Sequence, residues 1–199
     1  MLRRFDLAIL IGVLFAFALS SFGVFAGESA RIREQVFRLH IVANSDSPCD
    51  QTLKLAVRDA VLNERPELFA GGATKAEAKD LSLAQLPEIQ QIAADEIARR
   101  GYAYPILAEV VNMHFATRQY EGFILPAGRY DAIRITIGEG AGQNWWCIMF
   151  PPMCIPAASQ SVHPLEEQLA YLGQAPRYRA GFAVVEIVED LRNRVWGGE

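Results

Sequence analysis

Residues 36–65 read VFRLHIVANSDSPCDQTLKLAVRDAVLNER, and this stretch decides the kind of fold. Apolar side chains alternate over Val36–Val42 with Arg38 and His40 between them, which is the two-residue period of a β-strand. A short polar turn follows. Apolar residues then recur every three or four positions, as they do on one face of a helix. The stretch therefore predicts a strand, a turn and a helix in close succession.

The predicted helix has recognisable start and stop signals. Ser47 is a suitable N-cap, Pro48 fits the first helical position, and Asp50 stands three residues after the cap. Pro66 cannot continue the helix. We therefore expect a helix from Pro48 to about Arg65.

A second helical segment is expected before residue 102. Thr74 and Glu77 have the spacing of a capping box, which opens a helix that reaches about Gln85. Pro87 restarts or kinks this helix, because proline lacks the backbone N–H. Gly101 supplies the C-terminal stop.

The apolar period changes to two after residue 102, which predicts strands. The candidate strands are Ile106–Phe115, Gly122–Leu125, Arg129–Ile137 and Trp145–Phe150. The glycine-rich residues 138–144 resemble a phosphate loop superficially. They lack the Lys-Ser/Thr pair of a P-loop and lead into tryptophans, so we expect a hairpin connection instead.

The last segment is amphipathic, with Val184, Val188, Leu191 and Val195 on one face. That face could pack on the protein's own domain, which we expect, or could contact a partner. The predicted fold class is α+β. It comprises an N-terminal export helix, a helical segment after a first short strand, a mainly antiparallel sheet and a C-terminal amphipathic helix.

The N-terminus carries an export signal. Arg3 and Arg4 precede an uncharged run from Leu7 to Ala26, about 20 residues long and sufficient to span a bilayer core. Residues 1–27 are either a cleaved signal peptide or a membrane anchor, and in the second case residues 7–26 contact the membrane. Residues 28–199 are expected to form a single exported domain.

Composition excludes several classes of protein. The 199 residues are 51% hydrophobic and 21% charged, with a net charge of −4, which is typical of a folded domain and unlike disorder. No run of Lys and Arg and no aromatic-basic stripe is present. We therefore expect no nucleic-acid partner.

The three cysteines agree with export. Cys147 and Cys154 frame an eight-residue segment that contains two prolines, and a disulfide between them is reasonable outside the cytoplasm. Two buried free thiols or a reactive thiol are the alternatives. Cys49 is left over and is expected to be a small apolar residue in the first helical turn. No paired CxxC or HxxxH spacing is present, so we expect no metal and no cofactor.

The sequence predicts no catalytic residue. His40, His114 and His163 are the natural general bases. We expect His40 to face solvent or to hold a structural hydrogen bond, His114 to be similar, and His163 to have no role. A nucleophilic pair of Cys147 and His40 is conceivable, but a sequence cannot show that the two side chains meet.

Six residues are candidates for a partner-binding site: Asn44, Ser45, Asp46, Asn144, Trp145 and Trp146. The Asn44–Ser47 segment is either a polar turn with a helix cap or an anion- or backbone-binding cluster at a helix N-terminus. The two tryptophans occupy adjacent strand positions, so their rings should face opposite sides. One would then be in the core and the other exposed as a docking residue.

Two blocks of sequence resemble the stage II sporulation protein R family. The first begins RLHIVANSDS at residue 38, and the second, over residues 120–154, ends NWWCIMFPPMC. The combination of Asn-Trp-Trp-Cys with Phe-Pro-Pro and a second Cys is specific. The resemblance covers most of residues 38–154, and residues 155–199 are more variable.

The resemblance implies a signalling protein that is exported from the forespore into the intermembrane space. There it would activate a membrane-embedded aspartic protease of the mother cell, which processes the precursor of sigma-E. An exported cell-envelope hydrolase and a membrane-tethered septal structural protein are the alternatives.

Overall fold

The computed structural model describes residues 4–69, 74–120, 123–153 and 177–196. Side chains are described for residues 9–13, 15–16, 20, 26–69, 74–120, 124–153 and 186–195. The chain forms two compact units. One comprises Met1–Glu34, Ala116–Gly128 and Gln168–Glu199, and the other comprises Gln35–Phe115 and Arg129–Glu167.

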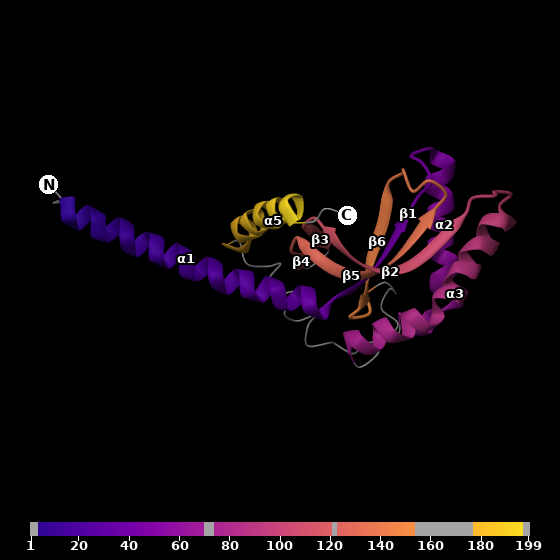
Figure 1. The fold of residues 1–199 in the computed structure, drawn as a ribbon, viewed down its shortest axis with the longest axis horizontal. Helices are drawn as coiled ribbons and strands as arrows, with labels where there is room; N and C mark the ends of the chain where they lie inside the picture. The colour runs from indigo at the N-terminus through magenta and orange to yellow at the C-terminus, as the bar shows by residue number, and fades with distance from the viewer. Residues whose placement is uncertain (1–3, 70–73, 121–122, 154–176, 197–199) are drawn as a thin grey trace. The chain divides into compact units, whose positions relative to one another are not determined.

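The larger unit contains a four-stranded sheet (Figure 1). Its strands are β1 (Phe37–Val42), β2 (Ile106–Phe115), β5 (Gly128–Ile137) and β6 (Asn144–Phe150), in the spatial order β2-β5-β1-β6. Strand β1 runs parallel to β5 and antiparallel to β6. The predicted α+β class is confirmed. The strand predicted over Val36–Val42 is β1, and the four strands predicted after residue 102 are β2, β4 (Phe123–Leu125), β5 and β6.

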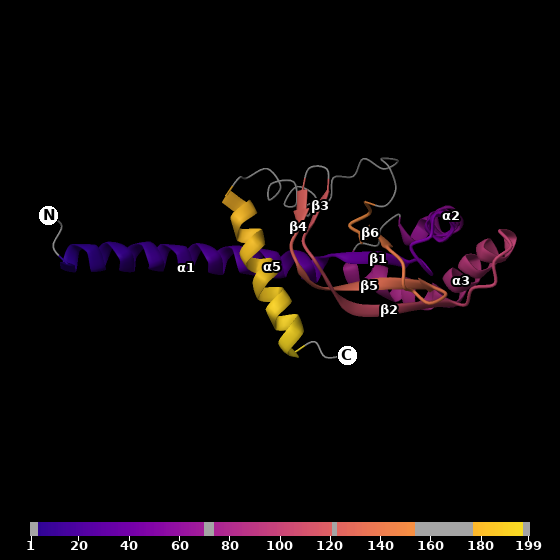
Figure 2. The ribbon, with the colours of Figure 1, turned by 90° about the horizontal axis from the view of Figure 1, so that it is seen from above.

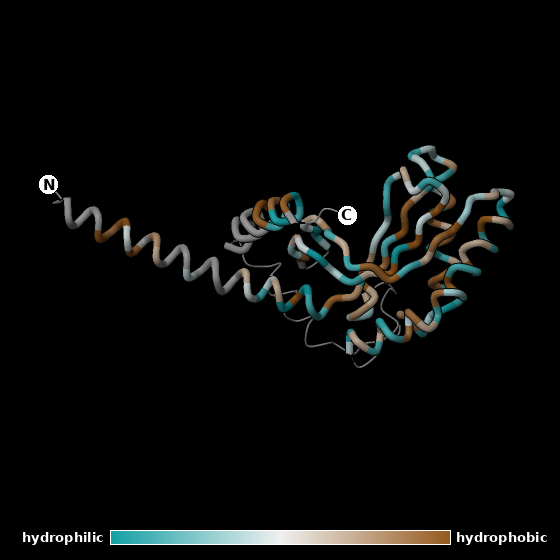
Figure 3. The backbone as a smooth tube through the Cα atoms, in the orientation of Figure 1, coloured by the Kyte–Doolittle hydropathy of each residue, from teal (hydrophilic) through white to brown (hydrophobic). Residues whose placement is uncertain are grey.

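Helices α2 (Pro48–Glu64) and α3 (Lys75–Arg99), with the short 3-10 helix η1 (Pro66–Leu68), pack against the sheet (Figure 2). The core joins Leu39 and Ile41 of β1 to Val57 of α2 and to Ile89 and Ile97 of α3, all of them nearly or wholly inaccessible to solvent. Burial of each such side chain stabilises the fold by about 1.5–3 kcal/mol. Hydrophobic residues follow the strands and hydrophilic ones lie in the turns at their ends (Figure 3).

The predicted helix caps are confirmed. Ser47 Oγ accepts a hydrogen bond from the Asp50 amide (3.1 Å), and Thr74 Oγ1 accepts one from the Glu77 amide (3.2 Å). The second helix was expected to reach about Gln85 and to restart or kink at Pro87; it is one helix, α3, which runs through Pro87 and ends at Arg99, close to the expected stop at Gly101. Packing of the following turns against the sheet outweighs the hydrogen bond that the proline removes.

The glycine-rich connection between β5 and β6 is not a hairpin. The two strands are not neighbours, because β1 lies between them. Residues 138–143 therefore cross the end of β1 from one side to the other. The expectation of a hairpin failed because the strands that flank a loop need not pair with each other.

Strand β1 is also buried on both faces, which its alternating pattern did not predict. Arg38 is wholly inaccessible to solvent and His40 is 4% exposed. A strand with charged and polar residues at alternate positions normally turns them towards water. Here the central position of β1 in the sheet buries them.

The smaller unit contains α1 (Arg4–Gln35), α5 (Arg177–Trp196) and a two-stranded sheet of β3 (Arg118–Tyr120) and β4 (Phe123–Leu125). Strand β3 was not predicted, because three residues are too few to show a period. Among the described residues, no helix is both long enough and apolar enough to cross a membrane.

Helix α5 turns a polar residue inward and apolar residues outward. Glu189 is 5% exposed and forms an ion pair with Arg33 of α1 (3.4 Å), which in turn donates a hydrogen bond to the Ala127 carbonyl oxygen (3.1 Å). Leu191 and Val195 are more than half exposed. The expectation that this apolar face packs on the protein's own domain is therefore wrong for these residues, because the Arg33–Glu189 pair turns the opposite face inward.

Candidate functional site

Two turns meet where β1 ends and β6 begins. Residues 43–47 follow β1 and residues 138–144 lead into β6, and we call them together the paired turns. The amide of Ala141 donates to the Asn44 carbonyl oxygen (3.1 Å), and the amide of Gly142 donates to the Ala43 carbonyl oxygen (3.0 Å). Two segments that are about 95 residues apart in the chain therefore form one surface.

Side chains of the first turn hold the second. Asn44 Oδ1 accepts a hydrogen bond from the Glu139 amide (3.0 Å), and Asp46 Oδ1 accepts one from the Gln143 amide (2.6 Å). Gly138 has a φ of +58°, and a Cβ there would stand 2.2 Å from Asn44 Oδ1. The glycine spacing in this loop thus serves the close approach of the two turns rather than a phosphate.

A buried carboxylate and a buried ammonium lie beneath the paired turns. Asp50 is 3% exposed, and its carboxylate accepts hydrogen bonds from Ser45 Oγ and from Asn44 Nδ2 (2.9 Å). These bonds, that of Ser45 first, lower the pKa of Asp50. Lys54 is 5% exposed, and Lys54 Nζ donates to the Gln143 carbonyl oxygen (2.9 Å). The sequence singled out Asp50 only as part of the helix start, and it did not single out Lys54, because the helical period places both at positions of the buried face.

The structure brings the predicted partner-binding residues together. The side chains of Asn44, Ser45 and Asp46 form hydrogen bonds within the paired turns and with Asp50, as expected of a polar turn beside a helix cap. Asn144 is exposed at the start of β6. The surface offered to a partner therefore consists of the outer atoms of these turns together with Asn144.

The two tryptophans face opposite sides of the sheet, as predicted. Trp145 pairs in register with Ile41, and Trp146 pairs with His40. The expected division into one core and one exposed ring is replaced by two half-buried rings. The Arg58 guanidinium lies 5.2 Å from the centre of the Trp145 ring, while the Trp146 ring lies 6.5 Å from that of His40.

His40 does not face solvent, contrary to one of the two expectations. Neither of its ring nitrogens has a hydrogen-bond partner among the described residues. Burial, and then the positive charges of Arg134 and Arg38, lower the pKa of His40 to about 4. Its ring meets the edge of Phe115 at 5.6 Å. The imidazole is therefore neutral at physiological pH.

Arg38 is the largest fully buried side chain of the sheet. Its guanidinium lies 3.9 Å from the centre of the Phe115 ring and 5.2 Å from that of Tyr130. Such cation–π contacts offset part of the cost of burying the charge. Nothing in the local sequence indicates this burial, because it depends on neighbours from other strands.

Comparison with known proteins identifies the family. A family model described as "Stage II sporulation protein R (spore_II_R)" matches residues 33–160. This chain belongs to the stage II sporulation protein R family. The matched region contains both of the paired turns, and membership of the family supports a role in sporulation.

A relative from Bacillus subtilis (strain 168), "Stage II sporulation protein R", is 42% identical over 123 residues. The match covers 62% of this chain and 55% of that protein, so the chain spans about half the length of the curated relative. No solved structure matches the chain.

The geometry of this family member excludes the conceivable nucleophilic pair. Cys147 pairs in register with Leu39, whereas His40 pairs with Trp146. Neighbouring residues of a strand point to opposite faces, so the Cys147 thiol and the His40 imidazole lie on different sides of the sheet. Elsewhere, His114 Nε2 is buried without a hydrogen-bond partner among the described residues, and His163 lies outside them.

The cysteines of this family member differ in their surroundings. Cys147 is buried on β6, whereas Cys154 lies outside the described residues, so their disulfide remains a prediction. Cys49 lies in the first turn of α2, as expected, and is a free, exposed thiol. Within the described residues, no group of three His, Cys, Asp or Glu side chains could hold a metal ion.

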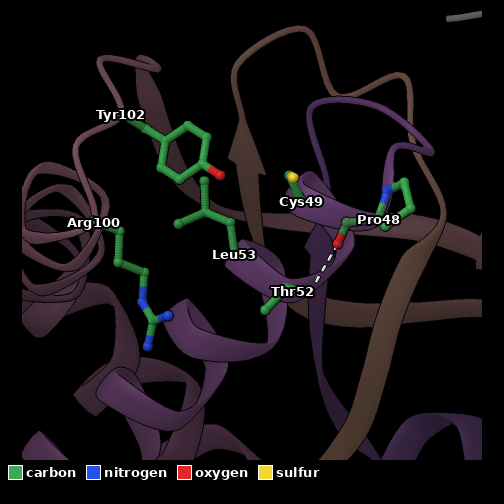
Figure 4. Close-up of a pocket in the computed structure, with 6 residues that line it drawn as sticks. All are labelled: Pro48, Cys49, Thr52, Leu53, Arg100 and Tyr102. Atoms are coloured by element: carbon green, nitrogen blue, oxygen red, sulfur yellow. Dashed lines mark hydrogen bonds between the residues drawn. The ribbon is translucent and has the colours of Figure 1, made fainter.

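Cys49 borders a shallow pocket of about 420 Å³ at the N-terminal end of α2 (Figure 4). The lining residues are Pro48, Cys49, Thr52, Leu53, Arg100 and Tyr102. Thr52 Oγ1 donates a hydrogen bond to the Pro48 carbonyl oxygen (2.8 Å), drawn dashed in Figure 4. The pocket adjoins the paired turns, since Pro48 follows the cap residue Ser47.

Proposed function

We propose that this protein is an exported sporulation signal that activates a membrane-embedded aspartic protease of the mother cell, which then processes the precursor of sigma-E. The observation that carries the proposal is the family match over residues 33–160, which includes both of the paired turns. The name of the relative, "Stage II sporulation protein R", supports the role in sporulation. Export, the protease and sigma-E come from the resemblance of the sequence blocks.

The geometry of the paired turns supports recognition of a protein partner. The turns are tied to each other and to α2 by backbone and side-chain hydrogen bonds. A surface that is already ordered loses little conformational entropy on binding. Asn144 and the half-buried rings of Trp145 and Trp146 extend this surface along β6, and large aromatic side chains often dominate the energy of protein interfaces.

Export is proposed on the N-terminal sequence. Arg3 and Arg4 stay in the cytoplasm of the forespore, and the apolar residues 7–26 carry the rest of the chain across its membrane. The protein would then act in the intermembrane space. It would remain membrane-anchored if residues 1–27 are not removed.

A binding role also suits the positions of the potential catalytic groups. His40 and Cys147 lie on opposite faces of the sheet, and the buried imidazole of His40 is enclosed by Phe115 and Trp146. A hydrolase would need a base within hydrogen-bonding reach of a nucleophile or of water. Activity would therefore reside in the partner protease.

Co-expression in a bacterium that does not sporulate tests the proposal. The full chain is produced with the membrane protease and the sigma-E precursor, and cleavage of the precursor is scored by immunoblot. Omission of the protease, or of residues 1–26, should abolish cleavage. Absence of cleavage with a chain shown to be folded and exported would refute the proposed function.

A variant with all three histidines changed to glutamine separates signalling from hydrolysis. Precursor cleavage should persist in this variant, because no histidine takes part in the proposed recognition. Hydrolysis of cell-wall material by the purified wild-type chain alone would favour the envelope hydrolase instead. An intact N-terminus, combined with no effect on the precursor, would favour a septal structural protein.

A further inference from the structure

We infer that Lys54 is a positioning residue of the signalling surface: its buried ammonium holds the paired turns in the arrangement that the partner recognises. This inference rests on the proposed function. It concerns a residue on α2 that lies beneath the candidate partner-binding residues and is not one of them.

Lys54 and Gln51 together reach both turns. Lys54 Nζ donates to the Gln143 carbonyl oxygen at 2.9 Å and to Gln51 Oε1 at 2.6 Å. Gln51 Nε2 donates to the Ser45 carbonyl oxygen at 2.9 Å and approaches the Gln143 carbonyl oxygen at 3.5 Å. One turn is therefore held at Ser45 and the other at Gln143, both by side chains of the first turns of α2.

Stability alone does not favour a lysine at this position. Lys54 is 5% exposed, and among the described residues its ammonium forms no ion pair. Burial lowers the pKa of Lys54 more than the negative charge of Asp46 raises it. Desolvation of a charge costs free energy that bonds to neutral acceptors repay only in part. Apolar replacements of buried charged groups are often neutral or stabilising. The neighbouring Leu53 and Val57 show that this side of α2 packs readily with apolar residues.

The benefit of the lysine is geometric. The Gln143 carbonyl directly precedes Asn144, the exposed first residue of β6. Fixing that carbonyl fixes the peptide plane from which Asn144 and then Trp145 project. The partner of the proposed function, a membrane protease, would then meet Asn144 and Trp145 at set positions.

The Lys54→Met substitution in the full chain tests the inference. Methionine keeps the length of the side chain but removes the donors. The midpoint of thermal unfolding should stay the same or rise, while precursor cleavage in the co-expression assay should fall by about tenfold or more. Leu53→Met is the matched control, since it changes a neighbouring buried residue of α2 whose side chain has no hydrogen-bond donor to hold the turns; it should leave cleavage near the wild-type level.

Hydrogen exchange of the backbone amides measures the order of the turn at residues 141–143 in the absence of the partner. In the purified Lys54→Met chain, the amides of Ala141, Gly142 and Gln143 should exchange with solvent about tenfold faster, whereas those of Val57 and Ile89 should keep their protection. If the wild type itself fails to promote cleavage, the proposed function fails, and these exchange rates alone then decide whether Lys54 positions the turn. Unchanged exchange at residues 141–143 overturns the inference. The inference is also overturned if the Lys54→Met chain supports precursor cleavage at the wild-type level. It is overturned as well if the loss of cleavage is accompanied by a fall in the unfolding temperature.

Discussion

Gly142 lies against the backbone of Ser45 so closely that a Cβ on Gly142 would stand 2.2 Å from the Ser45 carbonyl oxygen. The obstructing atoms belong to the backbone, so they cannot rotate away as a side chain would. The paired turns can therefore stay in contact only if residue 142 has no side chain. This relationship makes the glycine-rich loop a docking element for the turn after β1.

The substitution Gly142→Ala should force the paired turns apart. We expect the free energy of unfolding to fall by about 1–3 kcal/mol, because the new methyl group collides with backbone. Urea denaturation followed by circular dichroism measures the change. Ala141→Ser is the control, since residue 141 is exposed and should tolerate the hydroxyl. Equal stability of the Gly142→Ala and wild-type chains would mean that the turns do not touch.

Burial of His40 should make stability depend on pH between about 6.5 and 4. The pKa of His40 is about 4 in the folded chain and 6.5 when solvated, so the unfolded chain binds the extra proton first as the pH falls. The folded state should lose of the order of 3 kcal/mol across this range. Thermal unfolding at successive pH values measures the loss.

The variant His40→Gln should flatten the pH dependence in that window, because glutamine does not titrate. A wild-type unfolding temperature that is constant from pH 6.5 to 4 would contradict the burial of a neutral imidazole.

Protonation of Asp50 should lower the stability of the folded chain in a separate range of lower pH. The hydrogen bonds from Ser45 and Asn44 hold the pKa of Asp50 below its usual 3.8. Its contribution to stability is therefore complete above that value and is lost as the pH falls below it, when the carboxylate is protonated. Asp50→Asn should be less stable at neutral pH and should lose less on acidification below about pH 4. The measurement is the unfolding temperature of both chains from pH 5 to 2.5, and parallel curves would count against a carboxylate held by these two side chains.

Mass spectrometry of proteolytic fragments tests the predicted Cys147–Cys154 disulfide. Proteolysis of the exported protein without reduction should yield one fragment in which the two cysteines are linked, and Cys49 should be alkylated throughout. Closure of this eight-residue loop should stabilise the chain by about 2–3 kcal/mol, measured by unfolding with and without reductant. Cys49→Ser should leave both results unchanged, whereas alkylation of all three cysteines would rule out the bond.

Local sequence determined most of the elements. The period-two pattern of residues 36–42, the Ser47 and Thr74 caps and the later strands other than β3 were readable. Strand and helix periods and caps depend on neighbours within a few residues. The start of α3 and its stop before Gly101 were readable, but whether Pro87 restarts the helix or leaves it as one helix was not. The continuation through Pro87 depends on burial of Ile89 and Ile97 against the sheet.

Only the tertiary structure decided what these elements form together. The sequence singled out Asn44–Asp46 and Asn144 as candidates, but not the contact between Asn44 and Glu139 or the role of Lys54 beneath it. Those contacts follow from the insertion of β1 between β5 and β6, which carries the 138–143 loop across the end of β1. The same insertion buries Arg38 and His40. Strand order is set by the packing of segments far apart in the chain, and no local period of the sequence records it.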